Sequence, residues 1–351
     1  MSTAEGRTRP AWKVWSVVAT LVVVVAGLLH VYRNTNVLTE DRLCGGLVSV
    51  AKTDALLPGA GRLDARGDGL ADRLKDTVCE VEKSSVVLGS GKGTLTVRVW
   101  EEEGDAPLGD GAWPDLPEES FFSGKVTGGV DTYTGWVLLP EKCWTTKPVI
   151  VRGNSSKPIS DSAGFAALVT DTARAVAARA GCGDLPEEPG TLVPPRSEAA
   201  TPVSEGRVCG LEGFSVRGQV PTGTKVLEAG QKAPADLWSC TLFLDDDSRG
   251  IVRNDGFMTY TASRDPLLIA GVRKAPGTSR GEAPDGRKAD VVDQQRIVLS
   301  CAEGELYLAA KSGLQYLEGR KRHPELPQRS AYFESFVKSA VDTFDCGAAK
   351  G

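Results

Sequence analysis

Residues Val14 to Val31 read VWSVVATLVVVVAGLLHV, and this apolar run decides how the rest of the chain is arranged. Trp12 and Trp15 stand at its start. An apolar helix of roughly 20 residues matches the thickness of a bilayer core, and aromatic side chains suit the headgroup region. We therefore predict a transmembrane helix over residues 14–33 that follows a short tail, residues 1–13, and uses the lipid bilayer as its partner.

A cleaved signal peptide is the alternative for this segment. Such a peptide has an apolar core of about 7–15 residues and a small-residue cleavage site. Here the core is longer and no Ala-x-Ala step follows it. A lipoprotein signal fails as well, because Asp41-Arg42-Leu43 precedes the first cysteine, Cys44. We therefore expect the helix to be retained as an anchor.

Charged residues on the two sides of the helix predict its orientation. Arg7, Arg9 and Lys13 precede it with Glu5 as the opposing charge, whereas two basic residues follow it, Arg33 and Arg42, and Arg42 stands beside two acids. Basic residues favour the cytoplasmic side of a membrane. We predict a cytoplasmic N-terminus and an extracytoplasmic location for the bulk of the chain.

Composition indicates folded globular domains. The chain has 351 residues, of which 41% are hydrophobic and 25% are charged, and this leaves room for two ordinary domains after the anchor. The formal net charge of −5 argues against a nucleic-acid partner.

Eight cysteines lie beyond the anchor, in two sets of four. Successive gaps are 35, 64 and 39 residues in the first set and 31, 61 and 45 in the second. This shared pattern of medium, long and medium spacing predicts an internal duplication, with repeats over residues 36–186 and 206–351. An even number of cysteines outside a membrane is typical of disulfides. Zinc is the rival interpretation, but it favours close pairs such as CxxC, and none is present. We expect no metal and no cofactor.

The expected disulfides stay inside each repeat, and two pairings compete. We favour neighbours in sequence, because each such bond ties one helix to one strand. The alternative joins Cys44 to Cys182 around a Cys79–Cys143 bond. The favoured pairs are Cys44–Cys79, Cys143–Cys182, Cys209–Cys240 and Cys301–Cys346.

Hydrophobic periodicity gives the expected elements of the first repeat. Leu43, Leu47 and Ala51 indicate a helix over 39–57, stopped by Pro58-Gly59. A strand should run from residue 79 to residue 88. Further strands are expected over 94–99, 135–139 and 149–152, and residues 101–135 read as a long loop. An amphipathic helix, which carries Phe165, Leu168, Val169, Thr172, Val176 and Ala180 on one face, should close the repeat.

The second repeat shows corresponding features. Residues 271–290 read as its long loop, and strands are expected over 296–300 and 305–310. A helix with Phe333, Phe336 and Phe344 on one face should follow. The predicted fold class is α+β: a transmembrane helix and two repeated domains, each a helix, an antiparallel sheet and a helix with two disulfides. Between the repeats, residues 187–205 are rich in proline and predict a semi-extended spacer that lets the domains rotate.

Motifs with catalytic or ligand-binding chemistry fail on inspection. Gly89 to Thr94 resembles a phosphate loop, but Gly93 stands where that motif needs Ser or Thr. Asp245 to Gly250 resembles the start of a calcium loop, yet Gly256 occupies the twelfth position, which a bidentate Glu should fill. The two histidines, His30 and His323, are far apart in sequence, and no GxSxG elbow occurs. We therefore name no catalytic, cofactor or metal residue and expect a non-enzyme.

Cysteine placement resembles that of exported actinobacterial domains, namely the LpqN-like lipoproteins and the extracellular sensor domain of PknH-type kinases. The similarity lies in an early Cys-Gly motif at Cys44, a second cysteine that opens a strand at Cys79, and a closing Cys-Gly at Cys182. The chain departs from both groups, since it has no lipobox, no kinase domain and two copies of the pattern. The resemblance implies binding or sensing of envelope ligands.

Two functions follow as expectations. The leading one is a membrane-anchored, extracytoplasmic binding or sensor/adaptor protein whose partner is an unknown envelope protein or cell-wall ligand. The alternative is a cell-envelope hydrolase that uses a pair of carboxylates not visible as a motif. The basic run from Arg320 to His323 is interpreted as a solvated loop, with contact to anionic polymer or lipid headgroups as its alternative.

Overall fold

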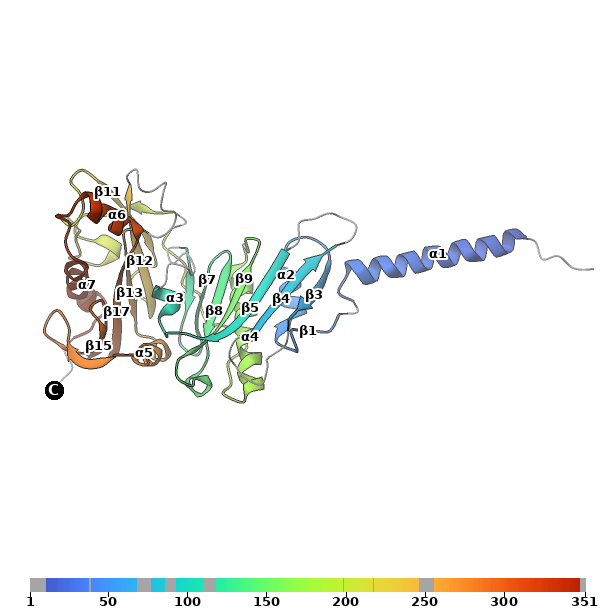
Figure 1. Ribbon diagram of the computed structural model, residues 1–351, viewed down its shortest axis with the longest axis horizontal. Helices are drawn as coiled ribbons and strands as arrows, with labels where there is room; N and C mark the ends of the chain where they lie inside the picture. Colours follow the sequence, from blue (N-terminus) through green and yellow to red (C-terminus); the bar gives the residue numbers. More distant parts are fainter. Residues whose placement is uncertain are drawn as a thin grey trace, which may run out of the picture.

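The computed structural model is a mixed α/β structure with an N-terminal apolar helix, antiparallel sheets and four disulfides. Helix α1 (Ala11–Asn34) projects from one end, and two lobes follow it in line (Figure 1). The first lobe comprises residues 42–180, elements β1 to α4, and the second lobe comprises residues 201–343, elements β10 to α7. The structure describes residues 11–37, 39–67, 77–85, 93–109, 118–197, 199–216, 218–245 and 256–347.

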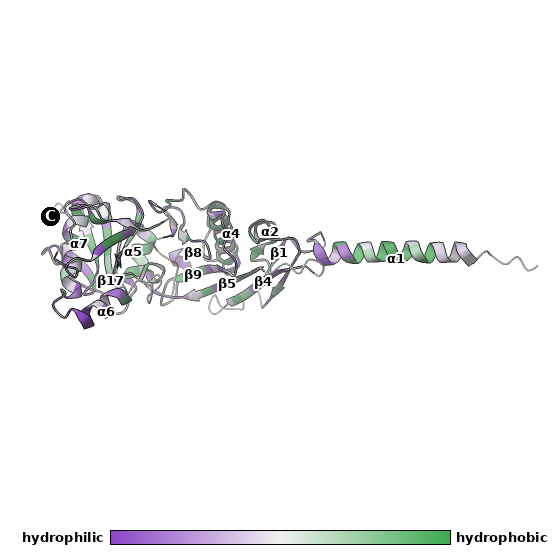
Figure 2. Ribbon diagram, turned by 90° about the horizontal axis from the view of Figure 1, so that it is seen from above, coloured by the Kyte–Doolittle hydropathy of each residue, from purple (hydrophilic) through white to green (hydrophobic). Residues whose placement is uncertain are grey.

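Helix α1 exposes large apolar side chains, among them Trp15, Leu21 and Leu28. The hydropathy colouring shows that the middle of this helix is hydrophobic (Figure 2). Within the described residues it is the one helix long and apolar enough to cross a membrane, over Trp15–Asn34. This span agrees with the predicted anchor. The four disulfides are typical of an oxidising environment outside the cytoplasm.

The end of α1 is bound to strand β3 (Arg62–Arg66) of the first lobe. The Arg62 guanidinium lies 4.3 Å from the ring centroid of Tyr32. The hydroxyl of Ser85 donates to Asn34 Oδ1 at 2.7 Å, and the amide of Leu63 donates to Asn36 Oδ1 at 2.8 Å. The helix therefore meets the lobe through several directional contacts.

The first lobe is built on a seven-stranded sheet in which all neighbouring strands are antiparallel. Its order is β3-β4-β5-β9-β8-β7-β6. After β3, its strands are β4 (Thr77–Ser84), β5 (Gly93–Glu101), β6 (Ser120–Phe122), β7 (Thr127–Val130), β8 (Thr134–Leu138) and β9 (Val149–Ser155).

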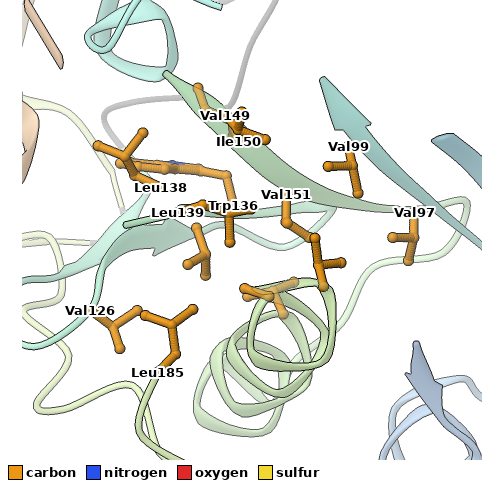
Figure 3. Packing of buried hydrophobic residues seen from close by; sticks show 14 of the residues in the cluster. Val97, Val99, Val126, Trp136, Leu138, Leu139, Val149, Ile150, Val151 and Leu185 are labelled. Atoms are coloured by element: carbon orange, nitrogen blue, oxygen red, sulfur yellow. The ribbon is translucent and has the colours of Figure 1, made fainter. Parts of the chain in front are cut away.

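Helix α4 (Ser162–Ala180) packs on one face of this sheet and closes a core of valine and leucine side chains (Figure 3). Close packing depends on two glycines, Gly135 and Gly153, on adjacent strands. A Cβ atom at either position would lie 3.0–3.2 Å from Cγ1 of Val169 on the helix. The amphipathic face of the sequence thus becomes the buried face of α4, as expected.

The second lobe contains an eight-stranded antiparallel sheet with the order β10-β11-β12-β13-β17-β16-β15-β14. Helix α7 (Arg329–Thr343) covers one face, where Phe336 packs between Trp238 and Tyr260. The strands are β10 (Thr201–Pro202), β11 (Lys225–Gly230), β12 (Leu237–Asp245), β13 (Met258–Ser263), β14 (Ser279–Glu282), β15 (Lys288–Asp293), β16 (Arg296–Cys301) and β17 (Gly304–Ser312). The other helical elements are η2 (Val208–Gly210), α5 (Pro266–Arg273) and α6 (Leu314–Arg322).

The helix predicted over residues 39–57 is wrong in its first half. A short hairpin of β1 (Arg42–Leu43) and β2 (Val48–Ser49) comes first, and α2 (Val50–Leu56) begins only after it. The turn of this hairpin needs left-handed backbone at Cys44, whose φ is 57°, and at the two glycines that follow. A helix cannot pass through such residues.

The two predicted long loops are also wrong in part. Residues 101–135 contain α3 (Ala106–Gly109) and the hairpin β6–β7, and residues 271–290 contain β14 and the start of β15. These strands are three to six residues long, and β7 contains two adjacent glycines, so their periodic signal is weak.

The disulfides join neighbours in sequence, which confirms the favoured pairing. Three of the bonds have one cysteine on a strand of the sheet, whereas Cys143–Cys182 joins η1 (Glu141–Cys143) to the residue that follows the C-cap of α4. The Cα–Cα distances are 5.9 Å for Cys44–Cys79, 4.8 Å for Cys143–Cys182, 5.8 Å for Cys209–Cys240 and 4.7 Å for Cys301–Cys346.

The lobes do not behave as the independent bodies that the proline-rich segment predicts. Apolar residues of the second lobe, among them Leu237, Leu268 and Val272, belong to the same buried cluster as the core of the first lobe. Gly104 lies against Gly271 of α5, where an added Cβ atom would sit 2.5 Å from backbone. The two lobes therefore pack directly against each other at this point.

The segment between the lobes is bonded to both sheets, in contrast to the predicted spacer. Val193 exchanges two backbone hydrogen bonds with Phe121 of β6, at 2.7 and 3.0 Å. Arg196 donates its amide to Gly230 of β11, and its guanidinium pairs with the buried carboxylate of Glu228 at 2.9 Å. Prolines in a sequence restrict the backbone but do not prevent such edge pairing.

We expect loss of the Cys143–Cys182 bond to destabilise the protein strongly. Replacing both cysteines by alanine opens a loop with a sequence separation of 39 residues, so the free energy of unfolding should fall by roughly 3–4 kcal/mol. Urea denaturation of the full chain in detergent, followed by tryptophan fluorescence, measures this change. A loss below about 1 kcal/mol would contradict the view that this bond restricts the unfolded chain.

Candidate functional site

A groove of about 650 Å³ lies at the junction of the two lobes. Strands β13 and β17 form its floor, the segment that follows β5 forms one wall, and α6 and the start of α7 border its end. Its volume falls within the range of small-molecule sites. Its polar lining residues are Glu101, Glu102, Glu103, Asp105, Lys147, Thr259, Thr261, Asp293, Gln295, Arg296, Tyr307, Lys311, Ser312 and Arg329.

Asp105 links the wall of the groove to its floor. Its Oδ2 atom accepts a hydrogen bond from the hydroxyl of Tyr307 at 2.6 Å and lies 3.1 Å from Arg296 Nη1. The Asp105 carboxylate is only 4% exposed. Burial, followed by the negative charge of Asp105, raises the pKa of Tyr307 well above its ordinary value, so this phenol remains a donor.

Arg296 forms ion pairs with three carboxylates in the groove. Besides Asp105, it pairs with Glu103 Oε2 at 2.9 Å and with Asp293 Oδ2 at 2.7 Å. Burial alone would lower the pKa of Arg296, but these three carboxylates outweigh it and raise that pKa. The arginine is therefore permanently charged, and the acids around it are held as its counter-ions.

Three other cations line the groove without such partners. Within the described ranges, no ion pair involves Lys147 on the wall, Lys311 on β17 or Arg329 at the start of α7. The Arg329 guanidinium lies 5.9 Å from the ring centroid of Tyr316, which leaves its N–H groups available. The Nε2 atom of Gln295 is buried without a hydrogen-bond acceptor.

A second buried acid, Glu119, lies at the junction but not on the groove. Its Oε1 accepts a hydrogen bond from the Trp136 indole, whereas its Oε2 has no described partner. Its backbone oxygen accepts from Gln231 Nε2 of the second lobe at 2.6 Å. Burial, followed by the negative charge of Asp131, raises the pKa of Glu119 well above its ordinary value.

The motifs weighed in the sequence do not meet in this groove. Gly89–Lys92 lies outside the described residues, and Gly93 and Thr94 open strand β5. Asp245 ends β12, and residues 246–250 also lie outside the described ranges. His323 ends α6 and lies 3.2 Å from Glu325, while His30 belongs to α1.

The basic run from Arg320 forms the last turn of α6, so its interpretation as a loop is wrong. Arg320 donates to the backbone of Leu326 at 2.6 Å, and Lys321 pairs with Glu318 at 2.6 Å. Cations at a helix C-terminus favour the helix through its dipole. The neighbouring Leu317 lines the groove, which makes α6 part of the site.

Cys209, Glu228 and Cys240 are the one described group of acids and cysteines close enough to share a metal ion. Both sulfur atoms are bonded to each other, so neither is a thiolate. Glu228 is occupied as well, because it accepts from the Cys209 amide and pairs with Arg196. The chemistry of these donors does not fit a metal.

The acids of the wall are the feature that sequence reasoning missed. Glu101, Glu102, Glu103 and Asp105 stand at the start of a segment that was predicted to be a long loop. Glu103 and Asp105 contact Arg296 and Tyr307, about 190–200 residues away, and the local sequence pattern does not predict these contacts. No protein-family model, curated protein or solved structure matches the chain.

We expect Asp105→Ala to weaken the junction. The variant leaves the buried Tyr307 hydroxyl without its acceptor and removes the least exposed partner of Arg296, so the free energy of unfolding should fall by about 2–4 kcal/mol. Chemical denaturation measures the change. Glu103→Gln is the matched control, since that carboxylate is 36% exposed and should cost less than about 1 kcal/mol. Equal losses would show that Asp105 has no special role.

Glu119→Gln should alter how stability depends on pH. A carboxyl whose pKa is raised on folding stabilises the protein below the unfolded pKa of about 4.3, and this contribution disappears as the pH rises through the folded pKa. The variant, which does not ionise, should therefore gain stability relative to the natural protein between pH 5 and pH 9. Denaturation midpoints across this range test the prediction. Glu118→Gln, at the exposed neighbouring residue, should leave the pH profile unchanged.

Proposed function

We propose that the protein is a membrane-anchored, extracytoplasmic binding protein that acts as a sensor or adaptor and is not an enzyme. The groove at the lobe junction carries this proposal. The two lobes that form the groove follow α1 in line (Figure 1). The lining of the groove offers cations and hydrogen-bond donors that have no described partner. Side chains of this kind supply orientation and specificity in ligand sites.

The two lobes are proposed to be copies of one ancestral domain. Their sheets support this, because β3-β4-β5-β9-β8-β7-β6 and β11-β12-β13-β17-β16-β15-β14 follow the same order when strands are counted along the chain. The first cysteine of each set, Cys44 or Cys209, also has left-handed backbone, with φ of 57° and 59°. In this proposal, residues 36–186 and 206–351 are the repeats, and together they build one composite groove.

The hydrolase alternative receives less support from the geometry. General acid catalysis needs a carboxyl with a raised pKa that reaches the substrate. Glu119 has such a pKa, but it is fully buried and does not line the groove. Three acids that line the groove, Glu103, Asp105 and Asp293, are counter-ions of Arg296. A ligand is therefore proposed to be bound here without being cleaved.

A photo-crosslinking side chain at position 317 tests the proposal in intact cells that express the full chain. Leu317 lines the groove and is 37% exposed, so the modified residue should form a discrete adduct with the bound ligand or partner. Position 314 is the matched control, because Leu314 is 46% exposed on the same helix but does not line the groove. A reporter active only outside the cytoplasm, fused after Gly351, checks orientation. Absence of an adduct from position 317, or the same adducts from both positions, would reject the groove as the binding site.

A further inference from the structure

We propose that the groove binds the anionic group of its ligand, a carboxylate or a phosphate, between Lys311 and Arg329. This inference rests on the proposed function, since it names the chemistry of the ligand that the groove would hold. Its basis is the distribution of charge along the groove, the lack of described counter-ions at one end, and the helix that begins there.

The groove lining contains an acidic group beside Tyr307 of strand β17 and a basic group, Lys311, farther along the same strand. Tyr307, Ala309 and Lys311 alternate onto one face of this strand, and all three line the groove. At about 3.4 Å per residue, Lys311 lies about 13 Å along the strand from Tyr307. Asp105 binds the phenol of Tyr307 and Arg296. Arg296 lies opposite Ala309 in the β16–β17 register, about 7 Å along the strand from Lys311, and its positive charge offsets part of the negative charge of its three acids.

The Lys311 end has positive charge without a partner. Lys311 is half-buried on the groove floor, next to Ser312 and opposite Thr259 of β13, and no described acid pairs with it. A partly desolvated ammonium gains strongly from an anionic partner. Arg329 adds a guanidinium, whose planar N–H groups suit two oxygens of a carboxylate or a phosphate.

Helix α7 provides an independent reason to place an anion here. It begins at Arg329 and is 15 residues long; its first turn contains no acid, and its N-cap residue, Gln328, makes no side-chain capping bond. The N-terminus of a helix carries partial positive charge and unpaired N–H groups, and both favour a negative group. The guanidinium of Arg329 adds its charge to the positive potential of this helix end.

Neutral donors extend the site from the basic end towards the acidic end. The buried Nε2 atom of Gln295 has no described acceptor, and the hydroxyl-bearing Thr261 of β13 lines the floor of the same groove. An amide or hydroxyl oxygen of the ligand can accept from these groups while its anion contacts Lys311. Lys147, on the opposite wall, offers a further cation to a ligand with more than one charge.

Binding of small polyanions to the full chain in detergent tests the inference. The probes are inorganic tripolyphosphate, a glutamate pentapeptide and, as the reverse charge, a lysine pentapeptide, each titrated calorimetrically at low and high salt. We expect one or both anionic probes to bind, more weakly at high salt, and the lysine peptide not to bind. Binding of tripolyphosphate alone assigns a phosphate ligand, and binding of the glutamate peptide alone assigns a carboxylate.

Substitutions locate the anion. Lys311→Met and Arg329→Met should each weaken binding by about 10-fold or more, because a charge-assisted hydrogen bond of roughly 1.5–3 kcal/mol is removed. Arg322→Met is the matched control, since Arg322 is an exposed cation of α6 that does not line the groove, and binding should change less than about twofold.

Two results would overturn the inference: neither anionic probe binds, or Arg322→Met weakens binding as much as the groove substitutions do. The crosslinking experiment at position 317 distinguishes rejection of the anionic ligand from rejection of the proposed binding function. An adduct that persists in Lys311→Met, with no anion binding, would retain the groove as a binding site and reject the anionic ligand.

Discussion

The buried carboxylate of Asp105 is the contact on which the arrangement of the two lobes depends. It belongs to the first lobe but binds Arg296 and Tyr307 on the second-lobe sheet. The apolar core shared by the lobes supplies attraction without direction, whereas an ion pair and a hydrogen bond fix one geometry. Gln231, which donates across the junction to Glu119, and Thr127, which donates to Asp265 at 2.8 Å, act in the same way. These polar contacts hold the floor of the groove, on the second lobe, against its wall, on the first lobe.

Much of each lobe could be predicted from local patterns. Leu95, Val97 and Val99 alternate as a strand with one buried face should, and α4 presents the apolar stripe that was expected. Cysteine spacing led to the correct disulfides because each bond joins elements that are near in sequence. Short strands such as β6 and β7 escaped prediction, since their few residues are stabilised by pairing with neighbours and not by a periodic pattern.

The junction and its groove could not be predicted from the sequence. Proline content predicts a spacer over residues 187–205, but it does not reveal that Val193 and Arg196 pair with strand edges. The ion pairs of the groove could not be predicted from the sequence either. Glu103 and Arg296 meet only after both sheets have formed. In the sequence, nothing distinguishes these two residues from the many other acidic and basic residues of the chain.

The contacts between α1 and strand β3 have a consequence for where the protein can act. Arg62 stacks on Tyr32. Ser85 bonds to Asn34, the last residue of the helix, and Leu63 bonds to Asn36 just beyond it, so the first lobe is attached directly to the end of the helix. With α1 in a bilayer, as proposed, the first lobe becomes a spacer of constant length beneath the groove (Figure 1). The groove would then sample a thin layer at one height above the membrane, and a ligand attached nearer to or farther from the lipid surface would stay beyond its reach.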